Sequence, residues 1–145
     1  MLLVDVNVLV YAHRVDALGH IDYLRWVQGM MDADEAYGIA DIVLSGLVRV
    51  VTHPRIFHPP SSTNEALAFA NELRGQPNCV RIEPGRRHWE IFTRLCRTVG
   101  ARGSLVPDAY LAALAMESGS EWITADRDYS RFPGLRWRHP LVNLM

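Results

Sequence analysis

Short apolar runs alternate along the chain with longer segments in which apolar residues recur at helical spacing. The first run, Leu2–Val4, consists of β-forming residues and ends at an aspartate, which is typical of a buried strand. Comparable patterns predict four more strands. They are expected at residues 37–40, 79–82, 121–124 and 135–137.

Helices are expected between these strands, and several of their ends carry capping signals. Asp41 is typical of an N-cap, and Ser62 with Glu65 forms a capping-box pattern. Gly100 is a typical helix stop, and Pro107 suits the first position of a helix. The predicted helices span residues 21–31, 42–53, 63–75, 86–99 and 107–119, with a helical turn at 126–132.

The alternation of strands and helices favours an α/β fold with a mostly parallel central sheet that is covered on both faces. The 145 residues are about the length of one domain, so we expect a single domain over residues 1–145. No apolar run approaches the length of a membrane span, and the N-terminus lacks the basic start of a signal peptide. We therefore expect a cytoplasmic protein without membrane contact.

The two cysteines, Cys79 and Cys96, are too few for a disulfide framework and match no zinc motif. They suit a reducing compartment. Cys96 falls on an apolar helical stripe with Trp89, Phe92 and Val99, so we expect this stripe to be buried in the core.

The chain contains 15 arginines and no lysine. The positive charges of the arginines nearly balance the negative charges of the 16 acidic residues. Without lysine the chain can use neither a Walker-A phosphate loop nor a Schiff base. A side-chain cation that contacts phosphate must therefore be arginine or protonated histidine. A GC-rich genome would explain the use of arginine in place of lysine equally well. The candidates are Arg14, Arg86, Arg87, Arg102, Arg127 and Arg131.

Acidic residues stand where an α/β sheet builds its sites. Asp5 ends the first strand, and Asp108 lies in the first turn of a predicted helix. Asp126 and Asp128 follow the strand at 121–124. Arg127 lies between these two acids in the sequence, and Arg131 follows them. Ligand crevices lie at the carboxyl ends of strands, and carboxylates that converge there would repel one another until Mg²⁺ or Mn²⁺ relieved the repulsion. Each acid also has a purely structural explanation, as a helix-dipole partner or a cap.

Four blocks of the chain, in their order and spacing, resemble the PIN domain of VapC-type toxins. They are LVDVNVL at 3–9, LVRVVTHPRIF at 47–57, PDAYLAALA at 107–115 and TADRDYSRF at 124–132. The resemblance covers nearly the whole chain and implies a three-layer α/β/α PIN-like fold. It also implies a metal-dependent endoribonuclease, the toxin half of a bacterial toxin–antitoxin pair that a cognate antitoxin neutralises.

By this resemblance, Asp5, Asp108 and Asp126 occupy the metal-site positions, and Asp128 is an accessory catalytic acid. The implied cofactor is Mg²⁺, for which Mn²⁺ can substitute, and the implied assembly is a homodimer. Asn7 and Thr124 match family positions whose polar side chains hold these carboxylates by hydrogen bonds.

This chemistry predicts hydrolysis of an RNA phosphodiester by a water that the metal activates for in-line attack. Asp126 or Asp128 would orient the water. The expected products carry a 5′-phosphate and a 3′-hydroxyl, because no 2′-hydroxyl is activated. Arg127 and Arg131 are the first candidates for RNA contacts, and target choice is expected to depend on loops such as residues 14–19 and 55–62.

One position departs from the family pattern. The family usually places a Glu on the helix after the second strand, where this chain has Gly46. Asp41 is a poor substitute because it lies on a different side of that helix. Close packing of another element or a site with one ligand fewer would explain the glycine. Arg49, one turn further on the same face, is expected to neutralise the pocket or to contact phosphate.

Two other functions compete with the ribonuclease. The missing Glu leaves open a weakly active or inactive PIN domain that acts mainly by binding an antitoxin. A phosphatase with Asp5 as its nucleophile is disfavoured, because Asn7 stands where such enzymes need a second aspartate and because lysine is absent.

Overall fold

The computed structural model describes residues 1–142 and contains a five-stranded sheet. Its strands lie in the order β3-β2-β1-β4-β5, and each neighbouring pair is parallel. The predicted α/β fold with a parallel sheet is therefore confirmed. The strands are β1 (Leu2–Val4), β2 (Tyr37–Ile39), β3 (Cys79–Arg81), β4 (Glu121–Ile123) and β5 (Trp137–Arg138).

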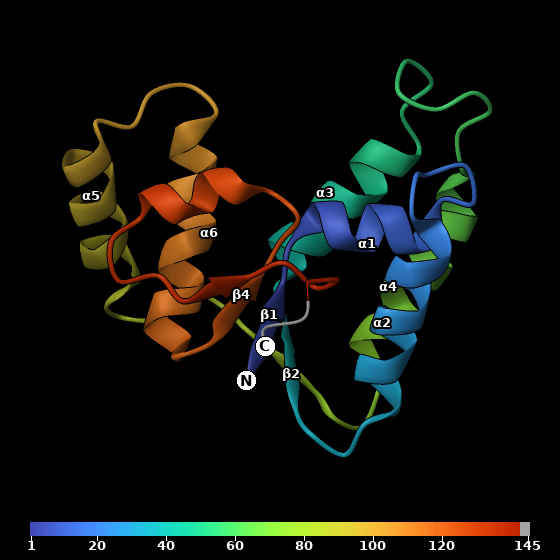
Figure 1. Cartoon of the computed structure of the whole chain (residues 1–145), viewed down its shortest axis with the longest axis horizontal. Coiled ribbons are helices and arrows are strands. Elements are labelled where there is room, and N and C mark those ends of the chain that lie inside the picture. Colours follow the sequence, from blue (N-terminus) through green and yellow to red (C-terminus); the bar gives the residue numbers. More distant parts are fainter. Residues whose placement is uncertain (143–145) are drawn as a thin grey trace.

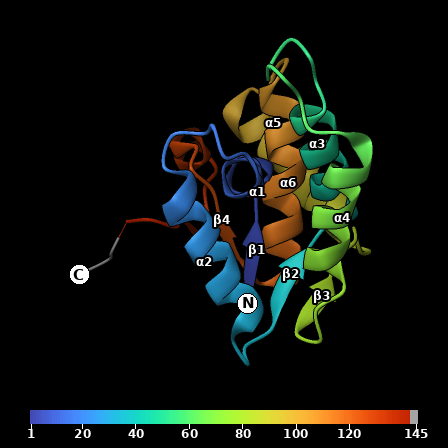
Figure 2. The same cartoon turned by 90° about the vertical axis from the view of Figure 1, so that its right-hand side faces the viewer.

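Helices cover the sheet on both sides, with α1 to α4 on one side and α5 and α6 on the other (Figure 1). Figure 2 shows α1 to α4 from their own side. The chain progresses from β1 through β2 to β3 and then returns to β4, so right-handed crossovers place the later helices on the opposite face. The helices are α1 (Val6–His13), α2 (His20–Asp32), α3 (Asp41–Val51), α4 (Thr63–Arg74), α5 (His88–Val99) and α6 (Leu105–Ser118), with a 3₁₀-helix η1 (Arg127–Arg131).

The strand order creates a topological switch point between β1 and β4. The chain leaves β1 towards β2, whereas it leaves β4 towards β5 on the other side. Val4 pairs with Ile123, so the carboxyl ends of these two central strands lie side by side. Open α/β sheets bind ligands in the crevice at such a point.

The core lies on both faces of these central strands. Leu3, Val4, Trp122 and Ile123 are fully buried, as continuous apolar runs in a covered parallel sheet require. Within residues 1–142, no helix is both long and apolar enough to cross a membrane.

Local capping signals predicted some helix ends correctly. Ser62 is the N-cap of α4 and its hydroxyl accepts a hydrogen bond from the Glu65 backbone N–H at 3.1 Å. Gly100 ends α5 with a positive φ of 63°, a conformation that glycine adopts without strain.

Other predicted ends were wrong. Asp41 is not an N-cap: it is the first residue of α3, and its carboxylate accepts a hydrogen bond from Arg74 Nε at 2.8 Å. Pro107 lies inside the first turn of α6, where its missing N–H costs nothing because the first four N–H groups of a helix have no helical partner. The prediction also missed α1 and began the last strand two residues early, at 135 instead of Trp137.

The predicted burial of the stripe on α5 was also wrong in part. Trp89 is 68% exposed, and Phe92, Cys96 and Val99 are only partly buried. The buried side of α5 consists of His88, Ile91 and Leu95. The helix packs against α6 by this neighbouring face, so the stripe lies at the border between core and solvent.

Candidate active site

An open pocket of about 450 Å³ lies at the switch point. It brings together three of the four predicted acids, Asp5, Asp108 and Asp126, from separate parts of the chain. The pocket is also lined by Asn7, Gly46, Arg49, Tyr129 and several apolar side chains. The pocket therefore contains all three predicted metal ligands.

Asp5 is the most buried of these acids, with 5% of its surface exposed. It ends β1 and caps α1, so its carboxylate accepts hydrogen bonds from the Val6 N–H and from Thr124 Oγ1, both at 2.7 Å. Its pKa is raised to about 6, mainly by burial and to a smaller extent by the charges of Asp108 and Asp126, while these two hydrogen bonds act in the opposite direction. A carboxylate in this setting is stabilised by any cation that enters the pocket.

Thr124 hydrogen-bonds the Asp5 carboxylate directly, whereas the hydrogen bonds of Asn7 go to Thr124 and the Ala125 backbone and not to a carboxylate within residues 1–142. The fully buried Thr124 hydroxyl donates to Asp5 and accepts from the Asp126 backbone N–H at 3.0 Å. Asn7 donates to Thr124 Oγ1 at 3.3 Å and accepts from the Ala125 N–H at 3.2 Å. This network joins the ends of β1 and β4 and fixes the directions in which their acids leave the sheet.

Asp108 reaches the pocket from the first turn of α6. Its Oδ1 accepts a hydrogen bond from the Tyr129 hydroxyl at 3.2 Å. Burial raises the pKa of Asp108, and the charges of Asp126 and Asp128 add to the effect. The pKa of Tyr129 is also raised, first by burial and then by the Asp5 and Asp108 charges, so its hydroxyl stays a donor.

The sequence prediction missed Tyr129. The only signal was its place in the block Asp126-Arg127-Asp128-Tyr129, which is where a turn returns to the pocket. The residue is 2% exposed, packs against Trp122 and Phe132, and turns its hydroxyl to the carboxylate on α6. It therefore connects η1 to Asp108.

Asp126 is the N-cap of η1 and Asp128 lies in its first turn, and the two acids differ in exposure. Asp126 lines the pocket and also caps the turn, since its Oδ1 accepts from the Asp128 N–H at 2.9 Å. The Asp128 side chain is exposed and does not line the pocket, although its charge acts on Asp108. The accessory position predicted for Asp128 thus lies at the rim.

Gly46 and Arg49 both line the pocket from α3. A Cβ at position 46 would lie 3.0 Å from Cγ2 of Val6 on α1, which is closer than side chains normally approach. This contact supports close packing as the explanation of the glycine. Arg49 is exposed and forms no ion pair within residues 1–142, so its guanidinium remains available at the pocket wall.

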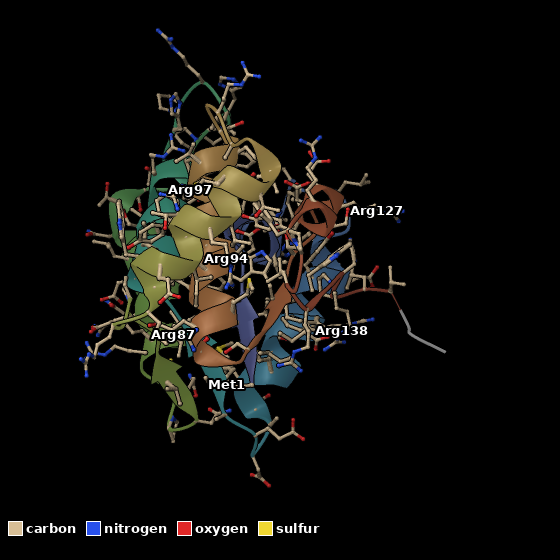
Figure 3. The ribbon with its side chains drawn as sticks, turned by 90° about the vertical axis from the view of Figure 1, so that its left-hand side faces the viewer. Met1, Arg87, Arg94, Arg97, Arg127 and Arg138 are labelled. Carbon is tan, nitrogen blue, oxygen red and sulfur yellow. The ribbon has the colours of Figure 1, made fainter. Side chains whose placement is uncertain are left out.

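The predicted RNA contacts Arg127 and Arg131 are exposed on η1 but do not line the acidic pocket. Arg127 lines a neighbouring hollow with Trp137 and Arg138. Figure 3 shows Arg127 on the η1 side and a second group of arginines along α5. The labelled members of that group are Arg87, Arg94 and Arg97.

The residues of the pocket fit a divalent cation in their chemistry. Oxygen donors from carboxylates are those that Mg²⁺ and Mn²⁺ prefer, and three carboxylates line this pocket. Within residues 1–142, no three His, Cys, Asp or Glu side chains stand close enough to form a ready metal cluster. The pocket therefore contains oxygen donors for a metal ion, but they do not form a preorganised coordination shell.

Known proteins are similar to this chain over nearly its whole length. A PIN domain family model matches residues 2–135. The chain is 47% identical to ribonuclease VapC43 of Mycobacterium tuberculosis over 141 residues, which cover 97% of this chain and 96% of that protein.

Solved structures with the same fold are more distant in sequence. VapBC2 from Rickettsia felis, bound to a DNA fragment from its promoter, aligns with a TM-score of 0.69 at 15% identity and covers 95% of this chain and 97% of that one. Mycobacterium tuberculosis VapC20, a toxin that cleaves the sarcin–ricin loop, aligns with a TM-score of 0.65 at 16% identity and covers 94% and 99%. These structures establish the likeness of fold.

Proposed function

Because this chain belongs to the PIN domain family, we propose that it is a metal-dependent endoribonuclease of the VapC type, the toxin half of a toxin–antitoxin pair. One observation carries the proposal: three carboxylates from separate elements line one pocket at the switch point of the sheet. Carboxylates in this arrangement suit phosphodiester hydrolysis, and the named relative at 47% identity is a ribonuclease.

The proposed cofactor is Mg²⁺, with Mn²⁺ as a substitute. Asp5 and Asp108 would hold the ion, and Asp126 would complete its shell. When bound, the ion supplies Lewis-acid stabilisation of the charge that develops on the scissile phosphate.

The chain's own residues supply the remaining steps. Thr124 and Tyr129 orient the carboxylates of Asp5 and Asp108 through the hydrogen bonds described above. Asp126 or Asp128 orients the attacking water, and Arg49 contacts a substrate phosphate at the pocket wall. The products carry a 5′-phosphate and a 3′-hydroxyl, because nothing in the proposed site activates a 2′-hydroxyl.

The proposed partners are RNA, a cognate antitoxin and a second copy of the chain. The similarity in fold to VapBC2, a protein pair, supports the antitoxin. Arg127 and Arg131, exposed beside the acidic pocket, are proposed to contact RNA. With these partners, the proposed site of action is the cytoplasm.

Cleavage of RNA by the purified chain in Mg²⁺ or Mn²⁺ tests the function. Asp5→Asn and Asp108→Asn should each lower the rate by more than about 100-fold, because loss even of a residue behind a metal ligand costs 10–100-fold. Thr124→Val should cost about 10–100-fold through misplacement of Asp5. The exposed Asp34→Asn serves as a matched control with unchanged activity.

Three results would contradict the proposal in different ways. Equal cleavage by the wild type and the Asp5 and Asp108 variants would show that the site is elsewhere. If the folded wild type cleaves no RNA but binds its antitoxin, the chain is instead an antitoxin-binding module, in line with the missing Glu at Gly46. A 2′,3′-cyclic phosphate product would exclude hydrolysis by water.

A further inference from the structure

The segment between α3 and α4 forms one wall of the acidic pocket. In Figure 1 it projects beyond α3 as a loop, in green. Two of its apolar residues, Ile56 and Phe57, line the pocket together with Asp5 and Asp108. Ile56 is 49% exposed, so its apolar side chain faces solvent at the mouth of a strongly acidic site. An apolar wall beside carboxylates contributes nothing to holding a cation and therefore needs another explanation.

Arg14 holds this loop in place. It follows α1 and donates from Nη1 to Ser61 Oγ at 3.2 Å and from Nη2 to the Pro59 carbonyl at 2.9 Å. Its guanidinium carbon also lies 4.3 Å from the centre of the Phe57 ring, a cation–π distance. One side chain thus contacts the loop at three points.

Other contacts fix Arg14 and the far end of the loop. Asp16 accepts hydrogen bonds from Arg14 Nε and Nη2 at 2.9 and 2.8 Å, so the planar guanidinium is oriented by a two-point ion pair. Ser61 is buried, lies 2.9 Å from His13 Nε2, and donates its backbone N–H to the Val51 carbonyl. Arg14 is only 12% exposed in its side chain.

These contacts overturn one sequence-based expectation. Arg14 was a candidate for a phosphate contact, but all three of its guanidinium nitrogens are engaged within the protein. Its charge is already balanced by Asp16. Its effect on the pocket must therefore pass through the loop and Phe57.

We propose that Ile56 and Phe57 form a base-contacting wall that selects the nucleotide next to the scissile phosphate, and that Arg14 is the positioning residue of this wall. The proposal rests on the ribonuclease function proposed above. Carboxylates and a cation act on phosphate, which every nucleotide shares, and so cannot distinguish one base from another. Unpaired RNA bases are recognised by stacking on aromatic and packing on apolar side chains, which this wall places beside the acids.

The test is the cleavage preference of the purified full-length chain on a pool of short RNAs of random sequence, with the product ends sequenced. The variants are Ile56→Ala, Phe57→Ala and Arg14→Met, and Arg25→Ala is the control because it removes an exposed arginine from α2 that does not line the pocket. We expect the first three to lower the ratio of kcat/KM between preferred and disfavoured nucleotides by about tenfold, the typical effect of small changes in an apolar pocket. Arg25→Ala should leave this ratio unchanged.

Arg14→Met combined with Phe57→Ala should shift the preference no further than Phe57→Ala alone, because Arg14 acts through that ring. Folded variants that keep the wild-type preference, or an Arg14→Met variant that slows all sequences equally, would overturn the proposal. If Arg14→Met fails to fold, the half-exposed Ile56→Ala decides alone. Absence of cleavage by the wild type would instead refute the ribonuclease function.

Discussion

At the scale of single residues, Asp5 shows how the site is built at the expense of stability. Its carboxylate is almost fully buried, and its pKa rises to about 6 because burial outweighs the two hydrogen bonds that favour its charge. A neutral asparagine would accept or donate similar hydrogen bonds without this cost. The negative charge of Asp5 therefore lies at a position where it would bind a cation.

The pH dependence of stability follows from this residue. The folded pKa of Asp5, about 6, lies above the ordinary aspartate pKa of 3.8, so the folded chain retains a proton that the unfolded chain releases. Stability of the metal-free chain should therefore fall as the pH rises from about 4 to about 6, by about 3 kcal/mol from this residue. Asp108, whose pKa is also raised, acts with the same sign.

Urea unfolding in EDTA at a series of pH values measures this effect. In the D5N variant, the decrease in the free energy of unfolding between about pH 4 and pH 6 should be smaller by the contribution of Asp5, about 3 kcal/mol. The variant should also be more stable than the wild type at pH 7. The same pH profile in D5N and wild type would contradict the prediction.

At the scale of elements, the crossing of α1 and α3 explains the glycine in the pocket wall. Val6 begins α1, directly after Asp5, and its Cγ2 occupies the space that a Cβ at position 46 would enter. Glycine within a helix costs about 1 kcal/mol relative to alanine, so α3 gives up stability for the close approach of α1. This approach brings Arg49 and Asp5 to the same pocket.

A double-mutant cycle checks this packing. In the wild-type background, Gly46→Ala should destabilise the fold by about 1 kcal/mol, because overpacking outweighs the gain in helix propensity. In a Val6→Ala background the same change should stabilise it by about 1 kcal/mol, because the crowding methyl groups are gone. Urea unfolding of the four proteins gives the coupling, and an effect of the same sign in both backgrounds would show that the contact is unimportant.

At the scale of the whole molecule, α5 forms an outer layer with an incompletely covered apolar side. Figure 1 shows it at the edge of the protein, beyond α6. Trp89, 68% exposed, lies on this side beside the partly buried Phe92. A large exposed aromatic residue with apolar neighbours is typical of a protein interface, and it is the surface that we assign to the proposed homodimer.

Trp89→Ser should therefore weaken self-association by about 100-fold, a typical effect for a central interface tryptophan. Leu18→Ser is the control, because Leu18 is 97% exposed but lies outside α5. Sedimentation equilibrium of the purified chain measures both. A Trp89→Ser protein that dimerises as tightly as the wild type would exclude this surface, whereas a monomeric wild type would exclude the dimer.

Local signals in the sequence predicted the alternation of elements, the Ser62 cap and the Gly100 stop, because each depends on residues within one turn of chain. They also predicted that Asp5 and Asp126 lie close together, since carboxylates after buried strands converge wherever the strands are parallel. They missed α1 because its continuous apolar residues show no helical period.

The sequence by itself determined the fold class, through the periodicity of apolar residues, and it indicated the acids of the proposed site, through their positions at the ends of strands and at the start of a helix. Only the tertiary structure decided which face of α5 is buried, why position 46 is glycine, and that Arg14 holds a loop instead of a phosphate. The physical reason is that packing and hydrogen-bond partners depend on distance in space. Arg14 and Ser61 lie 47 residues apart in the chain but within hydrogen-bond distance in the fold.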